Sequence, residues 1–456
     1  MNTYEVMSTE ENLLRTLKED TIKRNNNLIA FYHLLQAQEV NSSIAIDGRW
    51  GCGKTFFVKH MIMLIEAMNS QCKMEDDNRK NIIRSLAISS SDEQKMTNND
   101  VTIYYDAWRN DNNIDPVFSI IYEITKQFGL KYEFNNPDLF KAAASILDII
   151  KGWNINEMIN HLKGDDPLTY FRNQDELYDK IKIFFQDILK ERGNRLIVFI
   201  DELDRCKPSY AVNLLEQVKH FLSMDNVTFV FSVNIKELQH TIKSYYGDSF
   251  DACRYLDRFF NLRIGLSSVN MNMFLDEIGF EDKYLVDRIC IKFMKKYDFE
   301  MREVSRFYCQ VKASVYMATH DTGKWEFRYA DEIGRKIILT FIVPIIIGLR
   351  LVDSNEYNKF INGKDPQILI ELFDSKLVPD SYLKIFLDSD EALMKNDAHK
   401  KYVSREEILK RLYETVFLRS ENDDYRKVGS VEFNAYSKQL ALDASNMMSQ
   451  YADMDI

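Results

Sequence analysis

A cluster of glycines constrains the fold of this chain more than any other feature of its sequence. Only 15 of the 456 residues are glycine, yet Gly48, Gly51 and Gly53 fall within six positions. They belong to the segment GRWGCGKT, residues 48–55, which has the spacing G-x-x-x-x-G-K-T. An apolar run precedes the segment and an amphipathic helical pattern follows it. The sequence therefore predicts a strand, a glycine loop and a helix in succession.

A loop of this kind is suited to binding phosphate groups. Glycine adopts the backbone angles that turn successive amide hydrogens inward, and the following helix presents free N–H groups and a positive dipole end to an anion. Lys54 is expected to place its charge at the β- and γ-phosphates, and the Thr55 hydroxyl is expected to bind Mg²⁺. The predicted nucleotide contacts are Gly48, Arg49, Trp50, Gly51, Cys52, Gly53, Lys54, Thr55 and Phe56.

An acidic pair follows a second apolar run. Residues 196–200 read LIVFI, which is typical of a parallel strand covered on both faces, and Asp201 and Glu202 come directly after it. Open α/β sheets bind ligands at the carboxyl ends of their strands. We therefore expect Asp201 to hold Mg²⁺ and Glu202 to act as the general base that polarises the attacking water. A solvated acidic turn is the alternative interpretation.

A third apolar run, residues 228–233, ends in Asn234. An amide at a strand end is a candidate sensor of the γ-phosphate or of the attacking water, whereas the competing interpretation is that Asn234 caps the helix that follows. Residues 103–106 and 262–264 supply two further strands. Together these runs predict a mainly parallel α/β sheet with helices on both faces.

Several segments resemble the KAP family of P-loop NTPases, which is related to the AAA+ and STAND ATPases. The segment GRWGCGKT resembles the family's G-x-W-G-x-G-K-[ST] loop, and residues 200–208, IDELDRCKP, look like its D-[DE]-L-D-R-C-x-P signature. Residues 105–109, 255–259 and 302–307 are similar to further family segments. The resemblance covers about residues 20–315.

This resemblance implies an activity and partners. It implies Mg²⁺-dependent binding and hydrolysis of ATP by a P-loop sheet of the additional-strand class, in which one strand separates the acidic strand from the glycine-loop strand. It also implies a nucleotide-controlled switch or assembly with copies of the chain or with a protein effector, and a role in prokaryotic defence against phage or mobile elements. The alternative is a nucleotide-stabilised scaffold that hardly turns over, with its C-terminal helices as an interaction module.

ATPases of this kind often complete their site with an arginine. Arg258 and Arg302 lie in segments that resemble the family, and they are the favoured catalytic candidates. Arg205 is expected instead to pair with Asp204 or another acid. The remaining candidates are Arg254 and Arg306.

The chain is expected to fold in successive parts. These are an N-terminal helical segment at 1–40, an NTPase core at 41–265 with a helical insertion at about 130–190, and a C-terminal helical domain at 266–456. A helix is expected over residues 10–38, and residues 69–100 are expected to be rich in loops. No strand is expected after residue 266.

Charge and apolar runs limit the partners. The net charge of −11 argues against a molecule built as a whole to bind nucleic acid, although a local basic groove is compatible with it. Residues 337–349, the most apolar run, would span roughly 20 Å as a helix against about 30 Å of hydrocarbon core, so a buried helix and no membrane span are expected. Six dispersed cysteines and the lack of an apolar signal core predict a cytoplasmic protein. A redox role for Cys52 is the minor alternative to a small residue without such a role.

Overall fold

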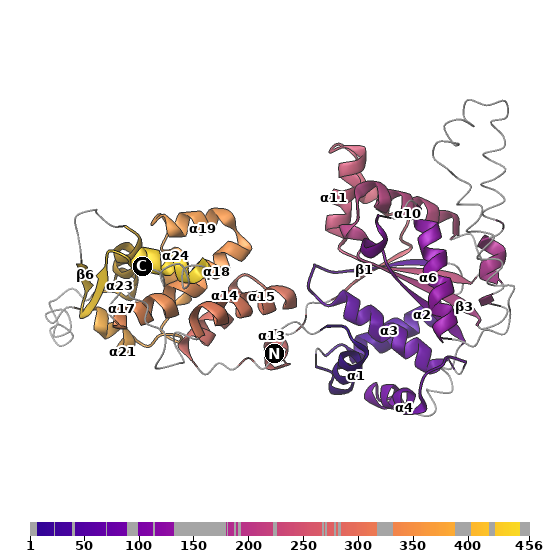
Figure 1. Cartoon of the computed structure of the whole chain (residues 1–456), viewed down its shortest axis with the longest axis horizontal. Helices are drawn as coiled ribbons and strands as arrows, with labels where there is room; N and C mark the ends of the chain where they lie inside the picture. Colours follow the sequence, from indigo (N-terminus) through magenta and orange to yellow (C-terminus); the bar gives the residue numbers. More distant parts are fainter. Residues whose placement is uncertain are drawn as a thin grey trace, which may run out of the picture. The chain divides into compact units, whose positions relative to one another are not determined.

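The computed structural model of the chain describes residues 7–21, 23–38, 42–69, 71–88, 99–112, 115–131, 179, 181–186, 188–189, 193–221, 226–266, 269, 271–277, 280, 284–316, 332–387, 403–418 and 425–446. The chain divides into two compact units, Val6–Met273 and Phe274–Ile456, and Figure 1 labels some of the elements of each. Most of the helical insertion expected at about 130–190 lies outside the described residues.

The first unit is built on a five-stranded sheet. Its strands are β1 (Ser42–Asp47), β2 (Asp100–Asp106), β3 (Arg195–Asp201), β4 (Val227–Val233) and β5 (Leu262–Gly265). The order across the sheet is β2-β3-β4-β1-β5, and every neighbouring pair is parallel. The expected α/β class is confirmed, and one strand, β4, separates the acidic strand β3 from the glycine-loop strand β1.

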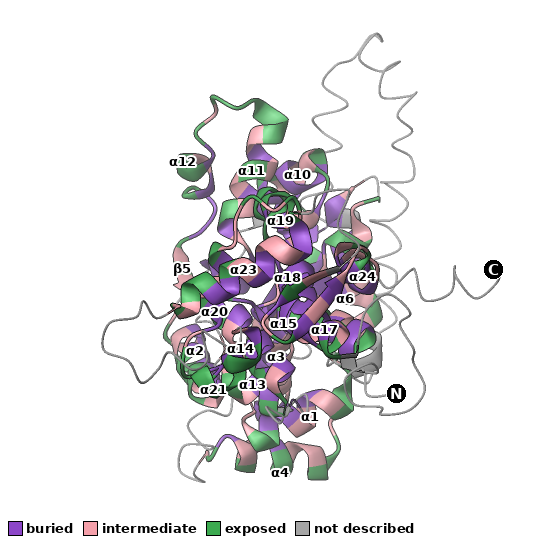
Figure 2. Ribbon diagram, turned by 90° about the vertical axis from the view of Figure 1, so that its left-hand side faces the viewer, coloured by how far each residue is buried: buried purple, intermediate pink, exposed green. Residues whose placement is uncertain are grey.

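Helices cover both faces of this sheet. They are α1 (Glu10–Glu19), α2 (Asn25–Ala37), α3 (Lys54–Met68), α4 (Asp76–Ser85), α6 (Pro116–Lys131), α10 (Pro208–Phe221), α11 (Ile235–Tyr246) and α12 (Ala252–Leu256), with the helical turns η1 (Trp108–Asn110) and η2 (Leu203–Arg205). α6, α10, α11 and α12 pack on one face, and α2 and α3 pack on the other. α1 and α4 pack against α3, and Figure 2 shows α4 as a largely exposed outer helix.

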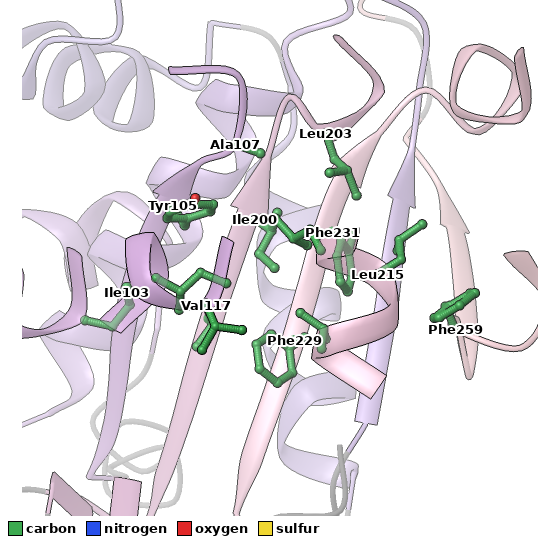
Figure 3. Close-up of a cluster of buried hydrophobic side chains, with 14 of the residues drawn as sticks. Ile103, Tyr105, Ala107, Val117, Ile200, Leu203, Leu215, Phe229, Phe231 and Phe259 are labelled. Atoms are coloured by element: carbon green, nitrogen blue, oxygen red, sulfur yellow. The ribbon is translucent and has the colours of Figure 1, made fainter. Parts of the chain in front are cut away.

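The strands alternate their buried side chains between the two faces. Ile200 on β3 packs with Phe229 and Phe231 of β4 in the cluster under α6 and α10, which Figure 3 shows. Phe199, one residue earlier, is buried in the cluster on the opposite face with α2 and α3. Because side chains alternate along a strand, a strand covered on both faces must be apolar at nearly every position. That is why β3 and β4 read as continuous apolar runs.

The N-terminal part differs from the expectation of one helix over residues 10–38. Two helices, α1 and α2, are present, because Asp20 and Lys23 take left-handed φ angles of +46° and +52° that end the first helix. The Asn25 N–H donates to the Asp20 carboxylate and so joins the two helices through a short turn. The stretch 69–100, expected to be loop-rich, contains the helix α4.

The second unit is largely helical. Its described elements are α14 (Leu285–Lys296), α15 (Met301–Val311), η3 (Lys312–Tyr316), α17 (Glu332–Ile337), η4 (Ile338–Ile342), α18 (Val343–Val352), α19 (Ser354–Ile361), α20 (Gln367–Leu372), α21 (Asp380–Leu383), η5 (Lys384–Phe386), α23 (Arg405–Phe417), β6 (Tyr425–Val428), β7 (Val431–Asn434) and α24 (Ser437–Asn446), and α13 (Met271–Glu277) spans its junction with the first unit.

The expectation that no strand follows residue 266 is wrong. β6 and β7 form an antiparallel hairpin, and the two residues between them are Gly429 and Ser430. Gly429 has a φ of +60°, and glycine in the first position suits a two-residue hairpin turn. Each strand has only four residues, and an alternating pattern of this length does not stand out among amphipathic helices.

The most apolar run, residues 337–349, forms the end of α17, the π-helical turn η4 and most of α18, and it is almost entirely buried. Gly348 lies where α18 meets α14, and a Cβ atom there would clash with the Phe293 ring. The expected buried helix is therefore present, interrupted by one π-helical turn. None of the described helices has both the length and the apolar character that a bilayer crossing requires.

Candidate functional site

The glycine loop connects the end of β1 to the start of α3. Gly51 and Gly53 both have a φ of +89°, a left-handed angle that residues with side chains rarely adopt. A Cβ atom at Gly48 would lie 2.6 Å from Cys52 Sγ, so this position has no room for a side chain. The loop therefore needs glycine for its conformation at two positions and for space at the third.

Lys54, the first residue of α3, is buried and points back along the loop. Its Nζ donates to the Gly48 carbonyl oxygen at 2.6 Å and to the Arg49 carbonyl oxygen at 3.2 Å. The ammonium group thus lies against the backbone of the glycine loop, at the N-terminal end of α3. Its charge and the helix dipole there both favour an anion.

Thr55 and Asp201 meet although 146 residues separate them. The Thr55 Oγ1 hydroxyl donates to Asp201 Oδ2 at 2.7 Å, and the Glu202 backbone N–H donates to Asp201 Oδ1 at 3.0 Å. Asp201 is almost completely buried at the end of β3. The hydroxyl and the carboxylate predicted to hold Mg²⁺ are therefore neighbours, joined directly by a hydrogen bond.

The strand ends are tied together at this edge of the sheet. The Gly48 N–H donates to the Val233 carbonyl oxygen at 3.2 Å, which joins the glycine loop to the end of β4. The Ile235 N–H donates to Asp47 Oδ1 at 2.9 Å, so the residue after Asn234 is attached to the end of β1. These bonds explain why segments far apart in sequence form one edge with a shared geometry.

Tyr104 is a neighbour of Asp201 that sequence reasoning missed. Its hydroxyl donates to Asp201 Oδ2 at 3.1 Å, and the Lys59 ammonium lies 5.2 Å from the centre of its ring. Burial, followed by the charge of Asp201, raises the Tyr104 pKa, so the phenol stays protonated and remains a donor. The strand pattern of β2 predicts that Tyr104 alternates with Tyr105 between faces, but it does not say which tyrosine reaches the acid.

Glu202 follows Asp201 and has a φ of +62°, an unusual left-handed angle for a residue with a side chain. Its carboxylate forms an ion pair with Arg205. Burial, with a further contribution from the charge of Asp201, raises the pKa of Glu202 to about 7, while the positive charge of Arg205 opposes this rise. A carboxylate with a pKa near neutrality suits general base catalysis.

The Arg205 guanidinium contacts the rings of two tryptophans. Its guanidinium carbon lies 5.4 Å from the ring centre of Trp50 in the glycine loop and 5.5 Å from that of Trp108 in η1. The Trp50 indole N–H also donates to the buried carboxylate of Asp204. Arg205 therefore pairs with an acid, as expected, but the acid is Glu202 rather than Asp204.

The other predicted catalytic residues lie at different places. Asn234 follows β4, and its side-chain oxygen accepts from the Glu237 N–H at 3.4 Å, so the expected capping role is present at the same position as the proposed sensor role. Arg258 is exposed after α12, and within the described part of the chain its guanidinium forms no hydrogen bond or ion pair. Arg302 is exposed on α15 in the second unit.

The remaining loop positions differ in exposure. Arg49 is exposed, Phe56 is partly buried, and Cys52 is buried beside Gly48. The six cysteines all lie among the described residues, and none of them forms a disulfide bond. Burial, followed by the charge of Asp111, raises the pKa of Cys206, so this thiol is not an activated thiolate.

The donor set fits Mg²⁺ bound together with a phosphate ligand. The described residues contain no group of three or more histidine, cysteine or acidic side chains that could hold a metal ion without help. One carboxylate and one hydroxyl, as in Asp201 and Thr55, suit Mg²⁺, which takes oxygen ligands and fills its shell from water and phosphate. The crowded glycine at position 48 and the left-handed glycines suit a backbone cradle for that phosphate.

Two comparisons with known proteins bear on the family of this chain. The model of the KAP family P-loop domain matches residues 24–316, which is more than half of the chain. An uncharacterized protein of Methanocaldococcus jannaschii is 32% identical over an alignment of 106 residues, and the match covers 20% of this chain and 52% of that protein. The chain thus spans about half the length of the curated relative that it matches.

Proposed function

The chain belongs to the KAP family of P-loop NTPases, and on this premise we propose that it binds ATP with Mg²⁺ and hydrolyses the bond between the β- and γ-phosphates. The hydrogen bond between Thr55 and Asp201 carries the proposal, because it joins the helix after the glycine loop to the acidic strand end. A hydroxyl and a carboxylate in direct contact can share one metal ion that also contacts a phosphate.

Each residue of the proposed site has a separate task. The loop amides and Lys54 would bind the phosphates, while Thr55 and Asp201 would hold Mg²⁺. Mg²⁺, when bound, supplies positive charge to the phosphate oxygens. Glu202 would accept a proton from the attacking water, and its raised pKa of about 7 supports this assignment.

The test is a comparison of ATP binding and turnover between the wild-type protein and Glu202→Gln. We expect Glu202→Gln to bind ATP with an affinity near that of the wild-type protein, because glutamine keeps the size of the side chain, and to lose turnover by about a hundredfold or more, because an amide cannot accept the proton. Glu237→Gln, a change at another glutamate near this edge, is the matched control and should keep its turnover.

Two outcomes would overturn parts of this proposal. Equal turnover in Glu202→Gln and the wild-type protein would remove Glu202 as the base. If calorimetry detects no binding of ATP in the presence of Mg²⁺, the nucleotide assignment itself is wrong. Binding by both proteins without turnover by either would leave a nucleotide-stabilised scaffold.

We further propose that nucleotide binding controls an assembly of copies of this chain or its association with a protein effector. The exposed Arg258, whose guanidinium has no hydrogen bond or ion pair within the described residues, supports a role in contacting another molecule. Light scattering with ATP and Mg²⁺ should show a change of mass for the wild-type protein and none for Lys54→Ala. Identical masses for both would remove the switch.

A role in defence against phage or mobile elements is the biological setting that we propose for this switch, on the basis of the family resemblance. Phage plating on cells that express the wild-type protein should be lower than on cells that express Lys54→Ala. Equal plating across a phage panel would remove this setting and leave the nucleotide chemistry unaffected.

A further inference from the structure

Arg205 connects three segments of the first unit that meet at the nucleotide edge. Its guanidinium lies over the indole of Trp50 from the glycine loop and over the indole of Trp108 from the segment after β2. It also forms the ion pair with Glu202 at the end of β3. None of the phosphate or metal contacts of the proposed site requires an arginine at this position.

The two indoles are more exposed than the arginine that they contact. Trp50 is 43% exposed and Trp108 is 53% exposed, whereas only 19% of the Arg205 side chain is exposed. Singly exposed aromatic rings are common on protein surfaces, so the shared contact with Arg205, rather than the exposure, distinguishes these two. Here each ring presents a face to the same guanidinium, which is a favourable arrangement for a planar cation.

Stacking and ion pairing use different parts of the guanidinium. Aromatic rings interact with its flat faces, whereas its N–H groups point outward in the plane. Two rings can therefore fix the plane of Arg205 while its edge remains available to the Glu202 carboxylate. A lysine ammonium has no such plane and would not be held in the same way.

Trp50 is itself held in place. Its indole N–H donates to Asp204, which is buried in η2 next to Arg205. Trp50 therefore makes two contacts with the same short turn, one through its N–H and one through its ring face. These two contacts join the glycine loop to the turn that follows Glu202.

We propose that Arg205 is a positioning residue for Glu202, and that the Trp50–Arg205–Trp108 stack holds its guanidinium in the plane that this role requires. This inference rests on the proposed function, because it assigns Glu202 the role of the base. In this role Arg205 acts through Glu202, with which it forms its ion pair.

Electrostatics gives a second reason for a fixed cation here. The Glu202 carboxylate faces the negative charges of Asp201 and Asp204, and the positive charges near it are Arg205 and Lys54. The Lys54 ammonium donates to a carbonyl oxygen of the glycine loop. Without Arg205, repulsion by the two aspartates would turn the Glu202 side chain away from the strand edge.

The first experiment observes the stack without requiring turnover. Full-length protein is labelled with fluorotryptophan after Trp153→Phe and Trp325→Phe, so that of the four tryptophans only Trp50 and Trp108 give fluorine NMR signals. We expect Arg205→Ala to shift both signals, because both rings lose the cation. Arg109→Ala, which removes an exposed arginine next to Trp108, is the control and should leave the Trp50 signal in place.

The second experiment separates kcat from KM for ATP. Arg205→Ala should lower kcat roughly tenfold or more and change KM by less than about threefold, because the base is misplaced and the phosphate contacts are intact. Arg205→Lys should recover little, since it restores charge without the plane. Trp108→Phe, which keeps an aromatic face, should retain more activity than Trp108→Ala.

The outcomes distinguish this inference from the proposed function. Unshifted fluorine signals in Arg205→Ala, or an unchanged or higher kcat, would overturn the positioning role. If the wild-type protein shows no turnover, the proposed function fails. The inference is then tested by the fluorine signals of Trp50 and Trp108 in Glu202→Gln. Shifts of both tryptophan signals in Glu202→Gln would support the link from the stack to Glu202, and unmoved signals would overturn it.

Discussion

In the unit Val6–Met273, three buried charged side chains, Lys54, Asp201 and Asp204, lie at the carboxyl edge of the sheet, whereas the unit Phe274–Ile456 buries the apolar run 337–349. Lys54 and Asp201 are both buried in the first unit, and each contacts a glycine-loop or helix-start partner. In the second unit, α18 instead packs through apolar side chains and one glycine against α14.

This difference teaches where each unit is sensitive to change. Burial of a charge is tolerated only with a specific partner, so the first unit depends on a few exact contacts. An apolar helix core depends on volume, because close-packed side chains leave little free space. Substitutions that remove a charge should therefore act on ligand binding in the first unit, and those that add volume should act on stability in the second.

The largest effect is expected for Lys54→Ala. Loss of the ammonium should weaken ATP binding by about a hundredfold, or about 3 kcal/mol, because a charge-assisted contact to phosphate is lost. Titration calorimetry with ATP and Mg²⁺ measures this change. Lys80→Ala, at an exposed lysine on α4, is the control and should bind ATP as the wild-type protein does. Equal affinity of Lys54→Ala and wild type would contradict the assignment.

A pH effect of similar size is expected at His60 on α3. Its Nε2 lies 3.0 Å from the Leu13 carbonyl oxygen and 3.1 Å from Thr16 Oγ1 of α1, and burial lowers the pKa of His60 from 6.5 to about 4. Between pH 4 and 6.5 the unfolded chain binds a proton at His60 that the folded chain does not. The free energy of unfolding should therefore fall by about 3 kcal/mol as the pH drops through this window. Above pH 6.5, His60 is neutral in both states, so it should cause no further change in stability.

Urea unfolding at several pH values measures this dependence. His60→Gln should show a flatter dependence than the wild-type protein, while His240→Gln, at an exposed histidine, should not differ from it. Hydrogen exchange should locate the acid effect of His60 in the first unit, which contains this residue. A slope unchanged by His60→Gln would show that other groups cause the pH dependence.

Gly348→Ala tests the volume rule in the second unit. The new methyl group would meet the fully buried Phe293 ring, so we expect a loss of about 1–3 kcal/mol in the free energy of unfolding. Gly265→Ala, at a glycine with open space around it, is the matched control and should change stability far less. ATP affinity should stay unchanged in both variants. If Gly348→Ala is as stable as the wild-type protein, α14 and α18 pack less closely than the structure shows.

The smallest effect is expected for Tyr104→Phe. This change removes one hydrogen bond to Asp201, worth about 1 kcal/mol, so the Mg²⁺ concentration for half-maximal ATP binding should rise about fivefold. Tyr105→Phe is the control: the Tyr105 hydroxyl contacts Tyr210, in the buried cluster on the face covered by α6 and α10. If both variants need the same Mg²⁺ concentration as the wild-type protein, Tyr104 does not support the metal site.

The sequence predicted the sheet class and the chemistry-bearing ends of three strands. Residues 48–55 and Asp201 stood out because their spacing and their apolar flanks are local signals. Tyr104, the contact of Trp108 with Arg205 and the hairpin β6–β7 did not, because they depend on residues far away in the chain or on very short strands. The break between α1 and α2 was also hidden, since left-handed angles at Asp20 and Lys23 leave little trace in a polar stretch.

Residue identity and order alone determined that a glycine loop precedes a helix and that an acid pair ends an apolar strand, because backbone freedom and apolar periodicity are properties of neighbours along the chain. Only the folded arrangement decided that Thr55 touches Asp201 and that the Arg205 guanidinium lies over the rings of both Trp50 and Trp108. Such contacts depend on strand order and on which face each side chain takes, and these are settled when distant segments pack together.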